Sequence, residues 1–397
     1  MLAVGVLGVS MAAQLRYRET EQGPWRPWSF TAIASARQSR GATAAEVKAY
    51  EATLQSLAAI VKRAPAVATP IGFAAELWGN LDGYGPPVEG QPAGKSVPLA
   101  GSLSFAAFPL VEFTRNGRLV NEDMKGGETE TLGFSVNSID ASMCSTLRPA
   151  EWSGAEVEGF LAPVMGAPVS GMARVGDVLV VKNNPKALWI PVTLADAWQP
   201  VVTRLTEQFE HDRSVYEKQK ADFAQWQTPA KRAERHAGWE EAAKSMPNGA
   251  AFVTNMEKSD AQIESDTRAR LAPGGSEERS VKTAERALQE VQAAVSALSP
   301  ADRSAASCYA SGASALAQKF RGVDQGGRGC QPIVKPNWGY FDPKLPRSAV
   351  QVLMVTRFER CLNARPSSEP ERRGGCVVNR QLIESMDWAA VRALMDR

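Results

Sequence analysis

Residues 171–202, GMARVGDVLVVKNNPKALWIPVTLADAWQPVV, contain the change from sheet to helix on which the fold depends. The β-branched run at 175–181 predicts a strand, because such side chains favour extended backbone. A turn rich in Asn follows, and residues 187–192 predict a second strand that pairs back as a hairpin. Thr193 and, three residues later, Asp196 then predict a helix start, since this pair can satisfy the first free N–H groups of a helix.

The region before this stretch predicts a sheet built around one helix. Thr43 and Glu46 predict the start of that helix, and apolar residues at helical spacing continue to about Arg63. Predicted strands follow at 66–81, 99–111 and 128–139. One helix followed by mostly antiparallel strands is typical of an α+β domain, which we assign to residues 14–193. A cystatin-like topology is one arrangement of such a domain.

The region after this stretch predicts a large all-α insertion at residues 194–320, either an up-and-down bundle or an array of helical hairpins. Its helices are expected at 194–227, 229–246, 250–271, 277–298 and 299–320. The last of them begins with Ser299, Pro300 and Asp302, which combine a cap, a first-turn proline and an acid. Residues 349–358 then predict a strand, for which the N-terminal sheet is the simplest partner.

Composition excludes some classes of partner. The chain has 397 residues, of which 45 are Lys or Arg and 43 are Asp or Glu, so its net charge is only +2. Nucleic acids and anionic membrane surfaces attract proteins with a marked excess of positive charge. We therefore predict no nucleic-acid partner. No segment is long and apolar enough to predict an integral membrane span.

Residues 2–13 form an apolar run that is too short to cross a bilayer but suits the core of a secretory signal. Small residues around Ala12 and Ala13 suit a signal peptidase. We therefore assign residues 1–13 to a signal peptide and expect a periplasmic or secreted protein. The alternative for this run is a buried N-terminal strand.

The cysteine spacing agrees with export. Cys308 and Cys330 form one predicted disulfide, and Cys361 and Cys376 form the other. A glycine-rich run lets Cys330 return to Cys308, and a Pro/Ser-rich loop without apolar residues of its own separates Cys361 from Cys376. We therefore expect residues 321–397 to be a disulfide-stapled segment that returns to the sheet domain. Cys144 is left over as a buried thiol. The alternative is a cytosolic protein with five reduced cysteines.

Two stretches resemble catalytic motifs, but the secondary structure predicted around each of them does not suit the motif. GQPAGKS at 90–96 is one residue short of a phosphate-binding loop, and a proline and a predicted strand follow it where a helix is needed. GFSVN at 133–137 is the nearest stretch to a nucleophile elbow, but it lies within a predicted strand instead of at a strand-to-helix turn. Cys144 lacks a nearby histidine that would activate it as a nucleophile.

Histidine is scarce, with only His211 and His236 in the chain. With Glu210 and Glu240 they could form a metal site if their helices pair, but both lie among charged residues on predicted exposed faces. We interpret them as surface histidines and predict neither a metal nor a cofactor. Trp25 and Trp28 lie in a proline-spaced segment. They predict an arm packed onto the domain by its indole rings, with a sugar-stacking platform as the alternative.

Two functions remain. The first is an exported protein of a bacterial-type cell envelope that binds or scaffolds a protein or a glycan and has no catalytic site. The long amphipathic helices support it, and their aromatic residues either contact the partner or form the core of the bundle; these are Trp198, Phe223, Trp226 and Trp239. The alternative is a cell-envelope hydrolase that uses a carboxylate pair on glycan or peptide, although no sequence feature selects two of the 43 acids.

The signal-peptide assignment makes a direct prediction. Mass spectrometry of the protein from an envelope fraction should find a new N-terminus near Ala13, because the apolar run would be cleaved on export. An intact Met1 in a cytoplasmic fraction would contradict it.

Overall fold

The computed structural model describes residues 16–32, 41–81, 97–115, 118–123, 131–139, 159–325, 329–357 and 376–397. The signal-peptide assignment at residues 1–13 therefore falls outside the described residues. The chain is a mixed α+β protein that divides into two compact units. The first unit comprises residues 1–147, 162–190 and 335–397, and the second comprises residues 148–161 and 191–334. Among the described helices, none combines the length and the apolar character that a membrane span requires.

The first unit is built on a sheet that has ten strands within the described residues. Eight of them follow the order β2-β3-β4-β6-β15-β10-β9-β8, while β1 and β5 also pair with β4. The strands are β1 (Arg16–Tyr17), β2 (Ser29–Ala32), β3 (Phe73–Leu81), β4 (Gly101–Arg115), β5 (Arg118–Asp123), β6 (Thr131–Val136), β8 (Met165–Val169), β9 (Met172–Val175), β10 (Val178–Lys182) and β15 (Val352–Thr356). All of these pairs are antiparallel except β2 with β3. The prediction that the strand after the helical region joins the N-terminal sheet is confirmed, because β15 lies between β6 and β10.

The hairpin predicted from residues 175–181 and 187–192 is wrong. The chain turns earlier, at Gly176 and Asp177, where Gly176 adopts a φ of 59° that suits a two-residue hairpin turn. β10 therefore pairs with β9 and β15, and residues 189–191 contribute to a different sheet. The strand predicted at 66–81 is also shorter than expected, because Pro65 begins a short helix, α3 (Pro65–Ala68), before β3.

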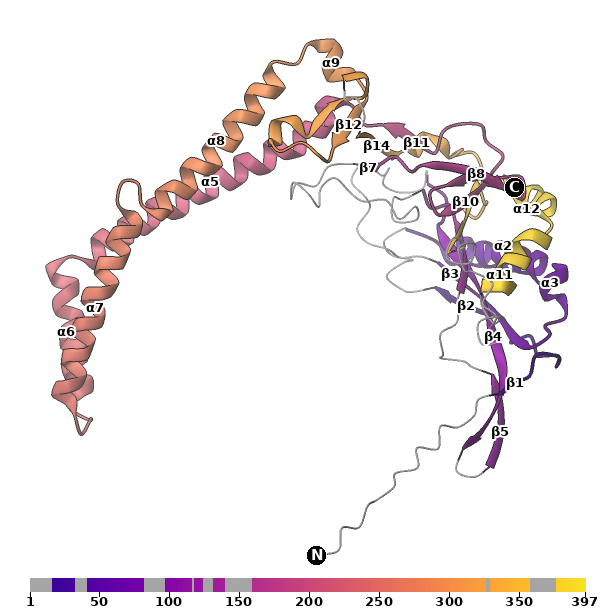
Figure 1. Ribbon diagram of the computed structural model, residues 1–397, viewed down its shortest axis with the longest axis horizontal. Coiled ribbons are helices and arrows are strands. Elements are labelled where there is room, and N and C mark those ends of the chain that lie inside the picture. Colours follow the sequence, from indigo (N-terminus) through magenta and orange to yellow (C-terminus); the bar gives the residue numbers. More distant parts are fainter. Residues whose placement is uncertain are drawn as a thin grey trace, which may run out of the picture. The chain divides into compact units, whose positions relative to one another are not determined.

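Four helices cover one face of this sheet (Figure 1). They are α2 (Ala44–Arg63), α3, α11 (Val378–Ser385) and α12 (Trp388–Leu394). The predicted start of α2 is confirmed, since Thr43 and Glu46 form a reciprocal capping box. Alternate strand residues point into this core, whose largest fully buried side chains include Tyr50, Leu54, Phe105 and Phe134.

Asn137, just after β6, joins segments that lie far apart in the sequence. Its side chain is 3% exposed, and its backbone has a φ of 57°, which Asn tolerates better than most residues. The Nδ2 group donates to the carbonyl oxygens of Leu99 at 2.9 Å and Ala349 at 2.7 Å. Its Oδ1 accepts from the N–H groups of Gln351 at 2.7 Å and Val352 at 3.3 Å. One buried amide therefore ties β6 to the segments that precede β4 and β15.

Replacing Asn137 with Ala should lower the free energy of unfolding by about 3 kcal/mol, since four hydrogen bonds are lost and their buried partners stay unpaired. Asn137→Gly should recover the smaller part that comes from the positive φ. Denaturant unfolding measures both. The exposed Asn121 of β5 supplies the matched control, Asn121→Ala, which should change little. Equal unfolding midpoints for Asn137→Ala and Asn121→Ala would contradict this account.

The second unit combines a small sheet with long helices. The sheet has the order β11-β14-β12-β13, and β7 pairs with β14. Its strands are β7 (Phe160–Leu161), β11 (Trp189–Pro191), β12 (Ser307–Ala310), β13 (Phe320–Gly322) and β14 (Cys330–Pro336). The helices are α5 (Leu194–Trp226), α6 (Pro229–Ala243), α7 (Gly249–Leu271), α8 (Ser276–Ser296) and α9 (Pro300–Ser304). Short 3-10 turns lie at η2 (Leu316–Gln318) and η3 (Val323–Gln325), while η4 (Trp338–Tyr340) belongs to the first unit.

The helix predicted from 299 to 320 ends at Ser304 instead. Its start is as predicted, because Ser299 and Asp302 form a capping box with Pro300 at the first helical position. After α9 the chain becomes extended, and β12 pairs with β13 on one side and β14 on the other. These tertiary pairings end the helix well before the predicted position.

Candidate functional site

The long helices of the second unit form an arm, here defined as residues 194–296. α5 runs beside α8, and α6 runs beside α7 (Figure 1). At 1.5 Å per residue the 33 residues of α5 span about 50 Å. The predicted helices of this region are thus confirmed, and they form an array of hairpins.

The seam of the arm follows a heptad spacing. From Phe209 outward, the less exposed residues of α5 alternate steps of three and four: Phe209, Asp212, Tyr216, Gln219, Phe223 and Trp226. In α8 the same spacing is followed by Glu277, Val281, Ala284, Leu288, Val291 and Val295, which include all of its buried residues. An average period of 3.5 residues keeps one stripe of each helix facing the other, as in a coiled coil.

The base of the arm is anchored to the small sheet by aromatic side chains. Trp198 is 2% exposed and meets the ring of Phe320 edge-on, with centroids 4.9 Å apart. Tyr309 contacts the same Phe320 ring at 5.7 Å. Val201 and Val291 complete this core. Trp198 is therefore a core residue of the base.

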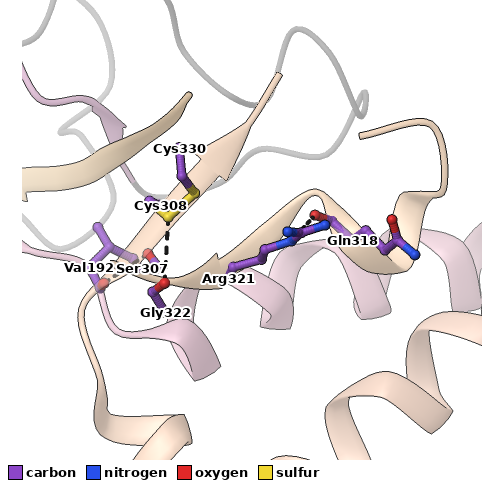
Figure 2. The surroundings of a disulfide bond; sticks show 7 residues. All are labelled: Val192, Ser307, Cys308, Gln318, Arg321, Gly322 and Cys330. Atoms are coloured by element: carbon purple, nitrogen blue, oxygen red, sulfur yellow. Dashed lines mark hydrogen bonds between the residues drawn. A yellow bond between two sulfur atoms is a disulfide. The ribbon is translucent and has the colours of Figure 1, made fainter. Parts of the chain in front are cut away.

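The predicted disulfide between Cys308 and Cys330 is confirmed, and it joins β12 to β14 beside this base (Figure 2). Their Cα atoms lie 5.4 Å apart. Ser307 fastens the same strand, because its hydroxyl donates to the carbonyl of Val192 at 2.8 Å. Since Tyr309 follows Cys308 on β12, the crosslinked strand is also the one that holds the aromatic anchor.

The second predicted disulfide stays a prediction. Cys376 is disulfide-bonded, but its predicted partner Cys361 and the leftover Cys144 lie outside the described residues.

Arg235 joins three helices where α5 passes into α6. Its Nη1 donates to the carbonyl of Trp226 at the end of α5, at 2.8 Å. Its Nη2 donates to Asp260 Oδ2 on α7, at 3.1 Å. The guanidinium also lies over the Trp226 ring, 3.9 Å from its centroid. Trp226 in turn stacks with Phe223.

Polar pairs also connect the distal hairpin, α6 with α7. Arg232 binds Glu264 at 2.8 Å. His236 lies between Glu257, 3.0 Å from its Nε2, and Glu240, 3.5 Å from its Nδ1. α6 has no buried residue, and Leu271 is the one buried residue of α7. Partly exposed ion pairs contribute little stability, so the distal hairpin should open more readily than the base.

The described residues contain no group of three or more His, Cys, Asp or Glu side chains arranged to hold a metal ion. His236 is instead 42% exposed and paired with two glutamates. His211 lies exposed on α5.

The carboxylates brought closest together in the first unit form an ion cluster with one arginine. Arg26 binds Asp123 at 2.5 Å and Glu76 at 3.4 Å, and its guanidinium lies over the ring of Phe108. A glycosidase pair needs room for the substrate between its two carboxyl groups, whereas a guanidinium occupies that position here. A half-open groove of about 580 Å³ lies between α3 and α11, and Glu19 is the one acid that lines it.

Burial shifts the pKa of three groups near residues 182–186 of the first unit. It raises the pKa of Tyr340, whose hydroxyl donates to Gln351, and it raises the pKa of Asp396, with a smaller contribution from Asp342. It lowers the pKa of Lys182, whose ammonium donates to two turn carbonyls. The ammonium thus closes a turn, which is a structural role.

The other candidates from the sequence are part of the fold's packing wherever the structure describes them. Residues 133–136 lie within β6, and Ser135 is buried. Trp25 packs as an arm residue, because its indole N–H donates to the carbonyl of Val67 and its ring lies 6.1 Å from that of Phe105. Trp28 packs against the same core. The stretch at 90–96 falls outside the described residues.

Arg235→Ala should speed amide hydrogen exchange in α6 and α7 by about tenfold or more, because one substitution removes contacts among α5, α6 and α7. Arg235→Lys should restore the slower exchange of the wild type only in part, since a lysine cannot stack as a planar group or donate through a fork of N–H groups. Arg232→Ala, at a more exposed ion pair, serves as the control. Unchanged exchange in α6 and α7 of Arg235→Ala would contradict the assignment.

The arm, the ion cluster and the groove have to be interpreted from their own geometry. Comparisons with known protein families, with curated proteins and with solved structures found no match to this chain.

Proposed function

We propose that the protein is an exported binding or scaffolding protein of the cell envelope, and that the distal part of the arm contacts its partner. One observation carries this proposal: α6 and α7 together bury a single side chain, so most of their surface contributes nothing to the packing of the fold. A segment of some forty residues that adds so little to the core is best explained by the surface it presents.

The chemistry of this surface favours a protein partner. Residues 201–300 carry 14 basic and 16 acidic side chains, which alternate along the helices. Mixed charges of this kind suit a partner with its own mixed charges, since they give specificity and fast association without favouring polyanions. The disulfide beside the base is consistent with export, because such bonds persist in oxidising compartments.

The hydrolase alternative has less support. It needs two carboxylates that face a substrate, whereas Glu76 and Asp123 bind Arg26, and Glu240 and Glu257 both pair with His236. Binding without catalysis is therefore the better proposal.

A shortened arm tests the proposal. In this variant a short glycine-rich linker replaces residues 217–271. The linker has to cross only about the length of one side chain, because the Tyr216 hydroxyl lies 3.4 Å from the carbonyl oxygen of Leu271. The base and the disulfide stay, so the variant should fold. We expect it to lose the partner complex that the full chain forms in envelope extracts.

Photo-crosslinking locates the contact. A photoreactive residue at the exposed positions Glu241 or Lys258 of the distal hairpin should give a discrete crosslinked protein, whereas one at the exposed Gln55 of α2 should not. Complexes that survive in the shortened variant, or crosslinks confined to the first unit, would contradict the assignment to the arm.

A further inference from the structure

On one face of the ten-stranded sheet, four neighbouring strands carry the polar residues Asn80, Ser102, Ser104, Ser135 and Thr356 in register. We call this set, together with Trp78 and Gly133, the hydroxyl band: Trp78 and Asn80 lie on β3, Ser102 and Ser104 on β4, Gly133 and Ser135 on β6, and Thr356 on β15. Met354, which pairs with Ser135, is fully buried in a separate apolar cluster and bounds the band on that side. The residues that alternate with those of the band, such as Leu77, Leu103 and Phe134, belong to the core beneath the helices. The band therefore lies on the opposite face of the sheet.

Ser135 lies at the centre of the band with an unsatisfied hydroxyl. It is 3% exposed, and its Oγ has no hydrogen-bond partner among the described residues. Burying an unpaired hydroxyl destabilises a fold, and buried polar atoms nearly always have a partner. This buried atom adjoins the partly exposed polar side chains of the band, so a polar ligand on the band could complete its hydrogen bond.

Its neighbours also have unused hydrogen-bonding capacity. Asn80 Oδ1 accepts from the N–H and the hydroxyl of Ser102, both at 3.0 Å, and this leaves the two Nδ2 hydrogens of Asn80 available. The Ser104 hydroxyl makes no hydrogen bond within the described residues, and Ser104 retains some exposure. These groups are uncharged and include both donors and acceptors.

The size and charge of the band limit the ligand. Three strand spacings of about 4.8 Å separate Trp78 from Thr356, so the band is roughly 14 Å wide. Gly133 has no side chain, so nothing projects from the sheet at the middle of the band. A Cβ added to Gly133 would lie 2.4 Å from Thr356 Oγ1 and would meet no other described residue within 4 Å. Glu76, two residues before Trp78 on β3, is paired with Arg26.

We propose that the hydroxyl band binds a neutral oligosaccharide. Sugar hydroxyls both donate and accept hydrogen bonds, as do Ser104 and Ser135, and the C–H face of a sugar ring packs on an aromatic ring such as Trp78. A charged ligand would find no counter-ion in the band, and a purely apolar one would leave its polar groups unpaired. The site lies in the first unit and does not depend on the role of the arm.

Titration calorimetry with chitotetraose, cellotetraose and maltotetraose tests the proposal. At least one of them should bind the full chain at millimolar concentration or below. Trp78→Leu and Ser104→Ala should weaken that binding by about tenfold, which corresponds to one lost hydrogen bond or ring contact. Ser29→Ala, at an exposed serine of β2, is the matched control and should bind as the wild type does.

Ser135→Ala separates a ligand contact from a structural role. Removing an unpaired buried hydroxyl should raise the melting temperature of the free protein by a few degrees, while the affinity for the sugar falls. Unchanged affinity in Ser135→Ala and Ser104→Ala, or no binding of any of the three sugars, would overturn the proposal. The variant without residues 217–271 should bind sugar normally, so failure of this site and failure of the arm remain distinguishable.

Discussion

The buried amide of Asn137 fixes the register on which both faces of the large sheet depend. In a strand, a slip of one residue moves every side chain to the other face. Such a slip of β6 would turn Phe134 out of the core and bring Ser135 beneath the helices. Asn137 opposes it by binding Gln351 and Val352 at the start of β15 and Leu99 before β4. The apolar core and the hydroxyl band are thus two results of one constraint.

Local signals made the helix starts predictable from the sequence. Thr43, Thr193 and Ser299 all cap helices as their spacing to the following acid indicated, because a cap depends on residues within one turn. The end of α9 was not predictable in this way. It depends on the pairing of β12 with β13 and β14, which follow later in the chain. Neither pairing produces a sequence signal near the end of α9. The turn at Gly176 has a sequence signal, a glycine followed by an aspartate, but the longer Asn-rich stretch at 182–186 also favours a turn.

The candidate sites show the same difference between local signals, which can be predicted from the sequence, and long-range contacts, which cannot. Spacing and a glycine-rich loop were enough to predict the pairing of Cys308 with Cys330. Nothing in the sequence pointed to Arg235, whose partners lie on two other helices, or to Ser135, whose missing partner is visible only once its burial is known. In α5 the outer part of the seam contains the polar residues Asp212 and Gln219 beside the aromatic residues Phe223 and Trp226. A partner that orders the sparsely buried distal hairpin would have to offset a loss of conformational entropy.

The central position of β15 has a consequence for the order in which the chain can fold. β6 and β10 both flank β15, yet the entire second unit is synthesised before β15. Until that last strand arrives, both flanking strands present open edges, which are prone to pair with other chains. A nascent chain therefore cannot complete the first unit until β15 has been made. A truncation just before Val352 should aggregate instead of forming a smaller domain.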